Sequence, residues 1–333
     1  MVWSQLNEVC WAYGVVTLLA IVVSSNLTEA ATFTAKGPLF KLRVAYAAPI
    51  GVMAPLWIAA ESGAFRAEGL EVEMVFIEPS ATMAALIAKE VDAVEQSAPA
   101  MIPAVLAGAD VTMIAGLLNR MIFSFHAQKE ITSAAQLRGK LLGTDRLGTA
   151  QDYGTRVSLS LMGFKPESGL QLLRIGNTAV LWVALQSGQI QGAALTPPQS
   201  FKADAAGYTR LVNTYDLPYQ NIGVVARKSD VEPRAEMWAR FLRSLKEGIQ
   251  RWYDDPKLAK DVLTKYTKEK DPEMLQKTYD FFTKQAGFTR ELALTDQGLQ
   301  QILTFLGSTV LPSAKDATPT QFYDTRVLQR LGK

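Results

Sequence analysis

Hydrophobic and polar positions along the chain form short apolar runs that alternate between strand-like and helix-like spacing. The first part of this pattern contains the strand candidates KLRVAYAA (41–48), LEVEMVFI (70–77) and VDAVEQ (91–96), and the helix candidates APLWIAAESGAF (54–65) and SATMAALIAKE (80–90). In this interpretation Gly63 ends the first helix and Ser80 is the N-cap of the second. The order strand, helix, strand, helix, strand predicts a mostly parallel sheet flanked by helices, which is an α/β fold.

The pattern recurs further along the chain. Residues 85–99 (ALIAKEVDAVEQSAP) align without gaps with residues 184–198 (ALQSGQIQGAALTPP), and the same offset places Lys41-Leu42 on Lys140-Leu141. Each aligned segment contains a helix end, a short strand, and a hydroxyl residue two positions before a proline. The sequence therefore predicts two similar α/β lobes, with shared βαβ patterning as the alternative to a true repeat.

Composition agrees with two lobes and argues against one class of partner. The chain of 333 residues is longer than one typical domain. Since 48% of the residues are hydrophobic and 20% are charged, the chain can bury a substantial core. The formal net charge is only +2, and the lysines and arginines are scattered singly. A nucleic-acid-binding surface needs clustered positive charge, so none is expected.

The N-terminal segment is typical of an exported protein. The run WAYGVVTLLAIVV (11–23) has the length of a signal-peptide apolar region, and small polar residues follow it. We expect residues 1–35 to be a signal peptide and the mature protein to be periplasmic or otherwise extracytoplasmic; a retained anchor or a misassigned start is the alternative. Cleavage would remove Cys10, the only cysteine, leaving no thiol nucleophile or thiolate ligand. We expect no metal and no cofactor.

Three hydroxyl residues occupy junctions where a predicted strand is followed by a helix: Ser97, Thr149 and Thr196. In open α/β sheets ligands bind beyond the carboxyl ends of the strands, where helix N-termini present free N–H groups. The three junctions therefore predict a cleft between the lobes for a polar or anionic group. Alternatively, each hydroxyl only caps its helix, and Thr149 with Asp152 approximates a capping box.

Several segments in order resemble one family of transport proteins. The stretches APLWIAAESGAFRAEGLEVEMVFIE, LIAKEVDAVEQSAPAMIPAVLAGADVTMIAGL, LRGKLLGTDRLGTAQDYGTR and LQSGQIQGAALTPP look like extracytoplasmic substrate-binding proteins of the nitrate, sulfonate and taurine type, grouped with NMT1/THI5-like proteins. The resemblance runs from about residue 42 to 331. It implies a two-lobed periplasmic-binding-protein fold (type II) and a monomer that delivers a small molecule to an ABC transporter permease.

The resemblance also implies where binding loops lie: after the first strand at 49–51, after a later strand at 96–98, and in a glycine-plus-hydroxyl loop at 148–149. We add to these loops two aromatic residues near the inferred cleft and two arginines that could meet an anion. The arginines could instead pair with Asp145 or Asp152 on the rim. The candidate ligand-binding residues are Tyr46, Pro49, Ile50, Gly51, Ser97, Ala98, Arg120, Arg146, Gly148, Thr149, Ala150, Gln151, Thr196 and Tyr219.

The pattern of predicted strands and helices also indicates where the lobes begin and end. We expect residues 38–127 and 223–333 to form lobe I, residues 128–222 to form lobe II, and the helical segments 235–255 and 271–287 to pack on lobe I. His126, the only histidine, lies at the predicted first crossover, where a structural or hinge role is expected because no catalytic partner is evident.

The predicted function is a solute-binding protein rather than an enzyme. The expected ligand is a small polar or anionic organic molecule of the sulfonate, nitrate or pyrimidine-like class. One alternative is an enzyme like the thiamine-pyrimidine precursor synthases, which this chain resembles without their cysteine-rich motif. A ligand-sensing module is the other alternative.

Overall fold

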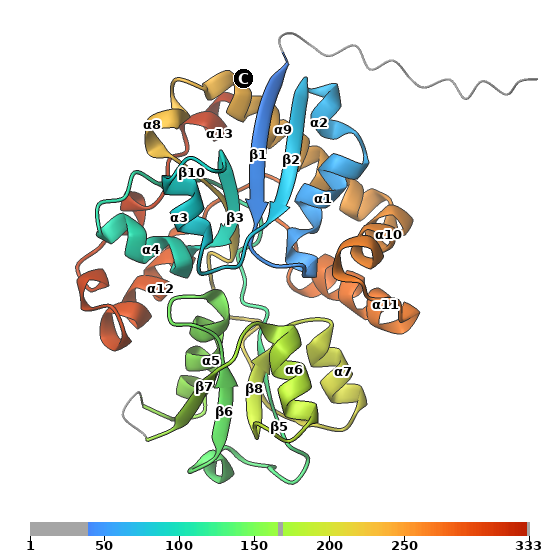
Figure 1. Ribbon diagram of the computed structural model, residues 1–333, viewed down its shortest axis with the longest axis vertical. Helices are drawn as coiled ribbons and strands as arrows, with labels where there is room; N and C mark the ends of the chain where they lie inside the picture. Colours follow the sequence, from blue (N-terminus) through green and yellow to red (C-terminus); the bar gives the residue numbers. More distant parts are fainter. Residues whose placement is uncertain (1–38, 166–168, 332–333) are drawn as a thin grey trace, which may run out of the picture. The chain divides into compact units, whose positions relative to one another are not determined.

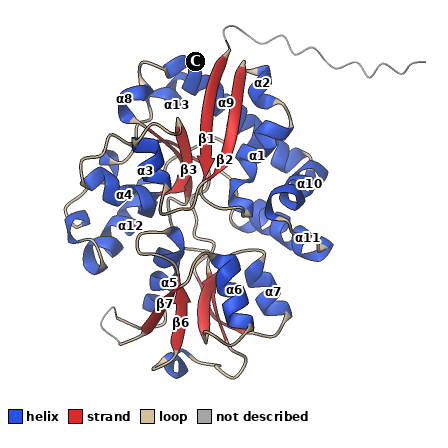
Figure 2. Ribbon diagram, viewed as in Figure 1, coloured by secondary structure: helices blue, strands red, loops and turns tan. Residues whose placement is uncertain are grey.

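The computed structural model describes residues 39–165 and 169–331, which belong to one compact unit. Two five-stranded sheets with flanking helices organise this unit (Figures 1 and 2). The signal peptide expected over residues 1–35, including Cys10, lies outside the described residues. Within the described ranges, no helix is long and apolar enough to cross a bilayer.

The first sheet has the strand order β2-β1-β3-β10-β4. Strand β1 pairs in parallel with both β2 and β3, whereas β10 returns from much later in the chain and pairs antiparallel with β3 and β4. We call this sheet and its helices lobe I. Its strands are β1 (Phe40–Tyr46), β2 (Leu70–Phe76), β3 (Ala93–Ser97), β4 (Thr112–Gly116) and β10 (Ile222–Ala226).

The second sheet repeats this arrangement with the order β7-β6-β8-β5-β9. Strand β6 pairs in parallel with β7 and β8, and β5 is the antiparallel strand inserted between β8 and β9. We call this sheet and its helices lobe II. Its strands are β5 (Ser124–Ala127), β6 (Leu141–Thr144), β7 (Gln171–Arg174), β8 (Gly192–Leu195) and β9 (Thr209–Asn213).

The matching strand orders confirm the two similar lobes that the sequence repeat predicts. The offset that aligns 85–99 with 184–198 carries β3 onto β8, and β1 and β6 occupy equivalent places in their sheets. The expected fold class, two-lobed with each sheet flanked by helices, is therefore confirmed. One boundary differs: β5 belongs to the second sheet, so the chain leaves lobe I before residue 124 and not at 127. Residues 111–127 are mostly apolar, and only the polar pair Asn119-Arg120 interrupts them where the chain crosses between the sheets.

Helices cover both sheets. They are α1 (Ala54–Glu61), α2 (Ala64–Ala67), α3 (Thr82–Ile87), α4 (Ala98–Leu106), α5 (Ala150–Leu161), α6 (Thr178–Gln186), α7 (Gln199–Ala205), α8 (Lys228–Val231), α9 (Ala235–Asp254), α10 (Pro256–Thr267), α11 (Pro272–Asp280), α12 (Asp296–Thr309) and α13 (Arg326–Leu331). Short 3-10 or π segments lie at Gly51–Met53, Ala134–Leu137, Phe281–Gln285, Pro312–Ala314 and Pro319–Gln321.

The C-terminal helices pack on lobe I, as expected, and α9 is the central one. Helix α9 lies against α1, and Gly248 allows the close approach because a Cβ there would collide with the Pro55 carbonyl oxygen. Trp57, Trp238 and Trp252 are all fully buried in the resulting core. These three side chains supply a large share of the apolar area that lobe I removes from water.

Two local predictions need correction. The N-cap of α3 is Ala81 and not Ser80, whose hydroxyl instead accepts a hydrogen bond from Arg146 Nη1 at 2.6 Å. His126 lies within β5 and not in a crossover; it is fully buried, with Nε2 2.9 Å from Asp204 Oδ1 on α7. Burial raises the pKa of Asp204, but hydrogen bonds from His126 and Arg210 outweigh it and lower that pKa overall. The histidine therefore joins β5 to α7 inside lobe II.

Candidate functional site

A cavity of about 170 Å³ lies between the two lobes. Most of its wall comes from segments that follow the carboxyl ends of the parallel strands β1, β2, β3, β6, β7 and β8, where ligands bind in open α/β sheets. The two crossover segments and the end of α10 complete the wall. The lining residues are Ala47, Ala48, Pro49, Ile50, Val52, Met53, Pro79, Gln96, Ile122, Phe123, Asp145, Thr149, Ala150, Gln151, Asn177, Thr178, Ala179, Thr196, Gln199, Asn221, Ile222 and Thr267.

Thr149 lines the cavity but uses its hydroxyl to build the loop. The hydroxyl accepts from the backbone N–H of Asp152 at 3.2 Å and donates to the carbonyl oxygen of Arg146 at 3.0 Å. Gly148, with φ of +86°, makes the left-handed turn that brings Thr149 into the N-cap position of α5. The capping interpretation is therefore the one that the structure bears out for this hydroxyl.

Thr196 differs because its hydroxyl has no hydrogen-bond partner in the described structure, although the residue is only 2% exposed. Its backbone N–H donates to the Thr178 hydroxyl at 3.0 Å, which fixes the loop after β8 against the start of α6. The Gln199 carbonyl oxygen Oε1, also in the cavity wall, is likewise buried without a partner. Buried polar atoms are almost always paired, so these two atoms mark where a ligand can bind.

Three other amide side chains in the wall donate hydrogen bonds to the protein. Gln96 Nε2 donates to Thr82 Oγ1 at 2.9 Å and to the Pro79 carbonyl at 3.3 Å. Gln151 Nε2 donates to the Ala194 carbonyl at 2.7 Å, and Asn221 Nδ2 donates to the Arg120 carbonyl at 2.9 Å. These bonds hold the cavity wall in shape before any ligand arrives, and they commit hydrogen-bond donors that a ligand would otherwise use.

An aromatic side chain closes the cavity at the first crossover. Phe123 lies flat against Gly154 of α5, where a Cβ would stand only 2.6 Å from the ring. The glycine therefore allows Phe123 to sit between the lobes and line the cavity.

Negative charge dominates the electrostatics of the site. Asp145, 8% exposed, is the only Asp, Glu, Lys, Arg or His among the described lining residues. Asp152, in the first turn of α5, is 2% exposed; burial raises its pKa, although its ion pair with Arg156 at 2.9 Å opposes that shift. An acid in the first turn offsets the attraction of a helix N-terminus for anions.

Six of the candidate residues line this cavity: Pro49, Ile50, Thr149, Ala150, Gln151 and Thr196. Gly148 shapes the loop without lining it. Gly51 faces the lobe I core, because a Cβ there would meet the Phe282 ring at 2.6 Å. Ser97 and Ala98 are buried behind Gln96, whose Oε1 accepts from the Ser97 N–H at 2.8 Å.

The candidate aromatic and basic residues lie elsewhere. Tyr46 packs edge-on against Trp57 with ring centroids 5.6 Å apart, and Tyr219 stacks on Tyr153 at 5.1 Å. Arg120 is exposed beside a different surface pocket, and Arg146 reaches across to Ser80. None of these four lines the cavity, so Phe123 is the only aromatic residue in the described lining, and that lining contains no lysine or arginine.

The rule used for the candidate residues could have found two of the missed ones. Asn177 follows β7 and caps α6 by accepting from the Ala179 and Val180 N–H groups at 3.0 and 3.4 Å, so it is a junction residue like Thr149. Asp145 directly follows β6. Phe123 and Thr267 reach the cavity through tertiary packing alone, and no local pattern marks them.

Comparisons with known proteins agree with this architecture. The family profile described as NMT1/THI5 like matches residues 51–259. No curated protein matches the chain significantly in sequence. A solved structure from Bordetella bronchiseptica RB50 superposes with a TM-score of 0.74 at 18% identity, covering 88% of this chain and 96% of that one.

Two other solved structures are similar in fold. The alkanesulfonate-binding protein SsuA from Xanthomonas axonopodis pv. citri, bound to MOPS, has a TM-score of 0.69 at 15% identity, covering 83% of this chain and 95% of its own. The periplasmic nitrate-binding protein NrtA from Synechocystis has a TM-score of 0.66 at 12% identity, covering 88% and 86% respectively. At these identities the similarity shows a shared fold.

Proposed function

We propose that this chain, which belongs to the NMT1/THI5-like family, binds one small organic molecule between its lobes and delivers it to an ABC importer. The observation that carries the proposal is the cavity itself. It lies between the lobes at the carboxyl ends of the parallel strands, and its wall contains buried polar atoms without protein partners. The named periplasmic nitrate- and sulfonate-binding proteins share this fold.

Contacts between the lobes support a mechanism in which closure retains the ligand. Lys202 of lobe II forms an ion pair with Glu269 of lobe I at 2.5 Å, and Arg146 donates to Ser80 across the same boundary. The rings of Phe201 and Phe281 meet edge-on at 5.9 Å. Within residues 39–165 and 169–331 the lobes are joined by the β4–β5 and β9–β10 segments, so rotation about these two segments would break the contacts and open the cavity with little change inside either core.

The composition of the wall supports binding over catalysis. The described lining residues include no histidine, lysine or cysteine, and the carboxylate of the lining aspartate, Asp145, accepts from the Arg146 backbone N–H at 2.7 Å rather than from a threonine hydroxyl that it could activate. His126 is held inside lobe II by Asp204 and does not line the cavity. We therefore propose that the protein is not an enzyme. The proposal also includes a monomer, which rests on the resemblance to the family and not on the cavity wall.

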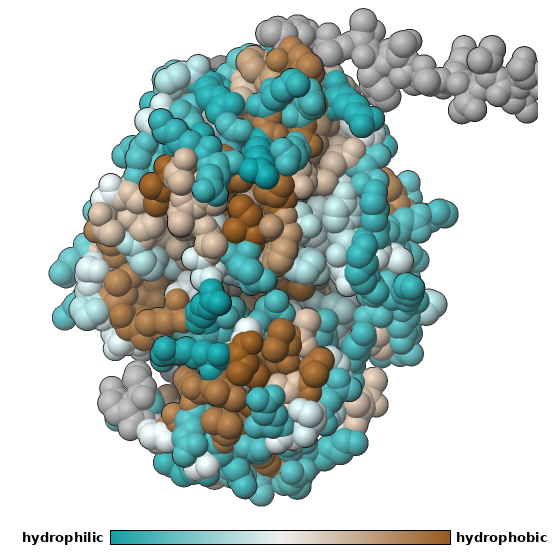
Figure 3. Space-filling model, viewed as in Figure 1, coloured by the Kyte–Doolittle hydropathy of each residue, from teal (hydrophilic) through white to brown (hydrophobic). Residues whose placement is uncertain are grey.

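Export and permease docking complete the proposal. The apolar run 11–23 acts as a signal peptide that places the protein outside the cytoplasm. Figure 3 shows hydrophobic surface gathered on lobe II beside its boundary with lobe I, and the exposed apolar side chains of lobe II include Leu147, Val180 and Val183. Exposed apolar surface of this kind is suited to a protein partner, which here is the permease.

A thermal-shift screen tests the proposed function. The purified protein is heated with nitrate, sulfonates, pyrimidines, amino acids, amides and amines, each in large excess. A ligand at a hundredfold excess over its dissociation constant should stabilise the protein by about 2.7 kcal/mol, because it binds only the folded state. The proposal is wrong if no small molecule in the screen, including the low-molecular-weight fraction of a cell extract, raises the melting temperature.

A further inference from the structure

Resting on the proposed function, we infer that the ligand is a non-anionic organic molecule of about one ring in size that donates a hydrogen bond to lobe II. Size is the first constraint. An apolar cavity of about 150 Å³ holds benzene. The cavity here, at about 170 Å³, therefore has room for a molecule of similar bulk with one small polar group.

Charge is the second constraint. The only formally charged residue in the described lining is Asp145, and the acid in the first turn of α5, Asp152, is already paired with Arg156. Arg146, the neighbouring base, extends away to Ser80 on the rim. Burying an anion beside an acid and without a positive partner costs several kcal/mol, whereas a neutral or positive group avoids that cost.

Hydrogen-bond polarity is the third constraint. Gln199 Oε1 can only accept, and it is buried without a protein donor. The Thr196 hydroxyl, which is close to Gln199 in sequence, is also buried without a hydrogen-bond partner among the described residues. On the donor side, Gln96 Nε2 donates both of its N–H groups to protein oxygens, and Gln151 and Asn221 each donate one. The wall therefore offers acceptors to a ligand N–H, as an amide or an amine would provide.

The N-termini of α5 and α6, which lie in the wall, do not reverse this preference. At α6 the Asn177 side chain accepts from the second and third N–H groups, those of Ala179 and Val180. At α5 the Thr149 hydroxyl takes one N–H group, and the acidic Asp152 lies in the same turn. Oxygen atoms of a neutral ligand can still accept from the remaining N–H groups there.

A charge-matched panel tests the inference. Phenyl, cyclohexyl and propyl skeletons each carry an aminomethyl, carboxamide, carboxylate or sulfonate group, so that size is held constant within a set. We expect the amines and amides to bind at least about tenfold more tightly than the anions of the same skeleton. An anion would be buried beside Asp145 without a positively charged partner, whereas an amine or amide avoids that cost. Calorimetric titration measures each affinity.

Two variants assign the preference to the cavity. Asp145→Asn should reduce the preference for amine over amide by at least about tenfold, since it removes the only lining carboxyl group. Asp261→Asn makes the same charge change on the exposed face of α10 and should leave both affinities unchanged. An equal effect of the two variants would overturn the assignment to Asp145.

The outcomes separate the inference from the proposed function. A carboxylate or sulfonate that binds as tightly as its matched amide overturns the inference while supporting solute binding. If no panel member and no compound of the wider screen binds, the proposed function fails and the inference fails with it.

Discussion

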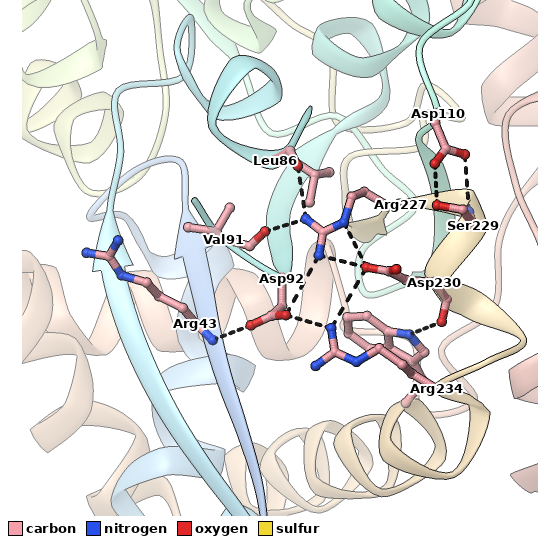
Figure 4. A network of polar contacts seen from close by, with 10 residues as sticks. Arg43, Leu86, Val91, Asp92, Asp110, Arg227, Ser229, Asp230 and Arg234 are labelled. Carbon is pink, nitrogen blue, oxygen red and sulfur yellow. Dashed lines mark hydrogen bonds and ion pairs between the residues drawn. The ribbon is translucent and has the colours of Figure 1, made fainter. Parts of the chain in front are cut away.

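Replacing Arg227 with methionine should destabilise the protein by about 3–5 kcal/mol, because it leaves buried acceptors without their donor. Arg227 directly follows β10, and its guanidinium is nearly buried. It donates to Asp230 Oδ2 at 2.7 Å and to the carbonyl oxygens of Val91 at 2.7 Å and Leu86 at 3.0 Å (Figure 4). Methionine preserves the unbranched stem but makes none of these bonds.

The network around Arg227 joins parts of lobe I that are distant in sequence. Asp92, just before β3, accepts from the Arg43 N–H of β1 at 2.8 Å and from Arg234 Nη1 at 2.6 Å (Figure 4). It lies at the amino end of β3, the end opposite the cavity. Arg227→Met should therefore lower stability while leaving ligand affinity of the folded protein unchanged.

Equilibrium urea unfolding measures the effect of Arg227→Met. The control is Arg251→Met, which removes an exposed pair with Glu247 at 2.7 Å and should cost at most about 1 kcal/mol. A loss from Arg227→Met no larger than the control's would show that the network contributes nothing beyond a surface ion pair.

Replacing Glu95 with methionine should stabilise the protein at pH 7 by up to about 3 kcal/mol. The substitution removes a buried carboxyl group without a hydrogen-bond partner, and about 3 kcal/mol is the upper end of the cost of burying such a group. Glu95 lies in the middle of β3, opposite Tyr46 of β1 and Val224 of β10. It is fully buried, and neither carboxyl oxygen has a hydrogen-bond partner in the described structure. Burial alone raises the pKa of this carboxyl well above its usual value of 4.5.

The raised pKa of Glu95 gives the expected pH dependence a definite sign. Between pH 4.5 and the folded-state pKa, the folded protein holds a proton on Glu95 that the unfolded chain has lost. The free energy of unfolding therefore falls as pH rises through this interval. The stabilisation from Glu95→Met should be largest at neutral pH and smaller near pH 4.5.

Unfolding at pH 4.5 and pH 7 measures both effects of Glu95→Met. Glu130→Met, at an exposed loop position, is the matched control and should change stability by no more than about 0.5 kcal/mol. A loss of stability in Glu95→Met at pH 7 would mean that the carboxyl has a favourable partner, contrary to the prediction.

The fold could be predicted from the sequence because its signals are local and repeated. Alternating and helical spacing identified β1, β2, β3, α1 and α3, and the offset between the two halves predicted the matched sheets. The first crossover was misplaced because the residues on both sides of it are mostly apolar and buried, and only the short polar pair Asn119-Arg120 marks where the chain passes from β4 to β5.

The candidate site was predictable only where a strand meets a helix. That rule found Thr149 and Thr196 and could have found Asn177. It could not say which hydroxyl is free, because the turn at Gly148 gives the Thr149 hydroxyl its partners, whereas the loop after β8 leaves the Thr196 hydroxyl without one. Side-chain direction was equally hidden: Tyr46 ends β1 near the cavity, yet it points toward Trp57.

The central claim is that a ligand binds in the cavity between the lobes, and a titration of Ala150→Phe tests it most directly. Ala150 lines the cavity at the start of α5, so a phenyl ring there would fill much of the space. Ala205→Phe makes the same change at an exposed position on α7 and is the control.

The compound that stabilises the parent protein most is titrated calorimetrically into all three proteins, after melting curves show that they are folded. We expect one site per chain and equal affinity in the parent and Ala205→Phe, with at least about a hundredfold loss in Ala150→Phe, equivalent to about 2.8 kcal/mol. Parent-like affinity in a folded Ala150→Phe protein would contradict the claim.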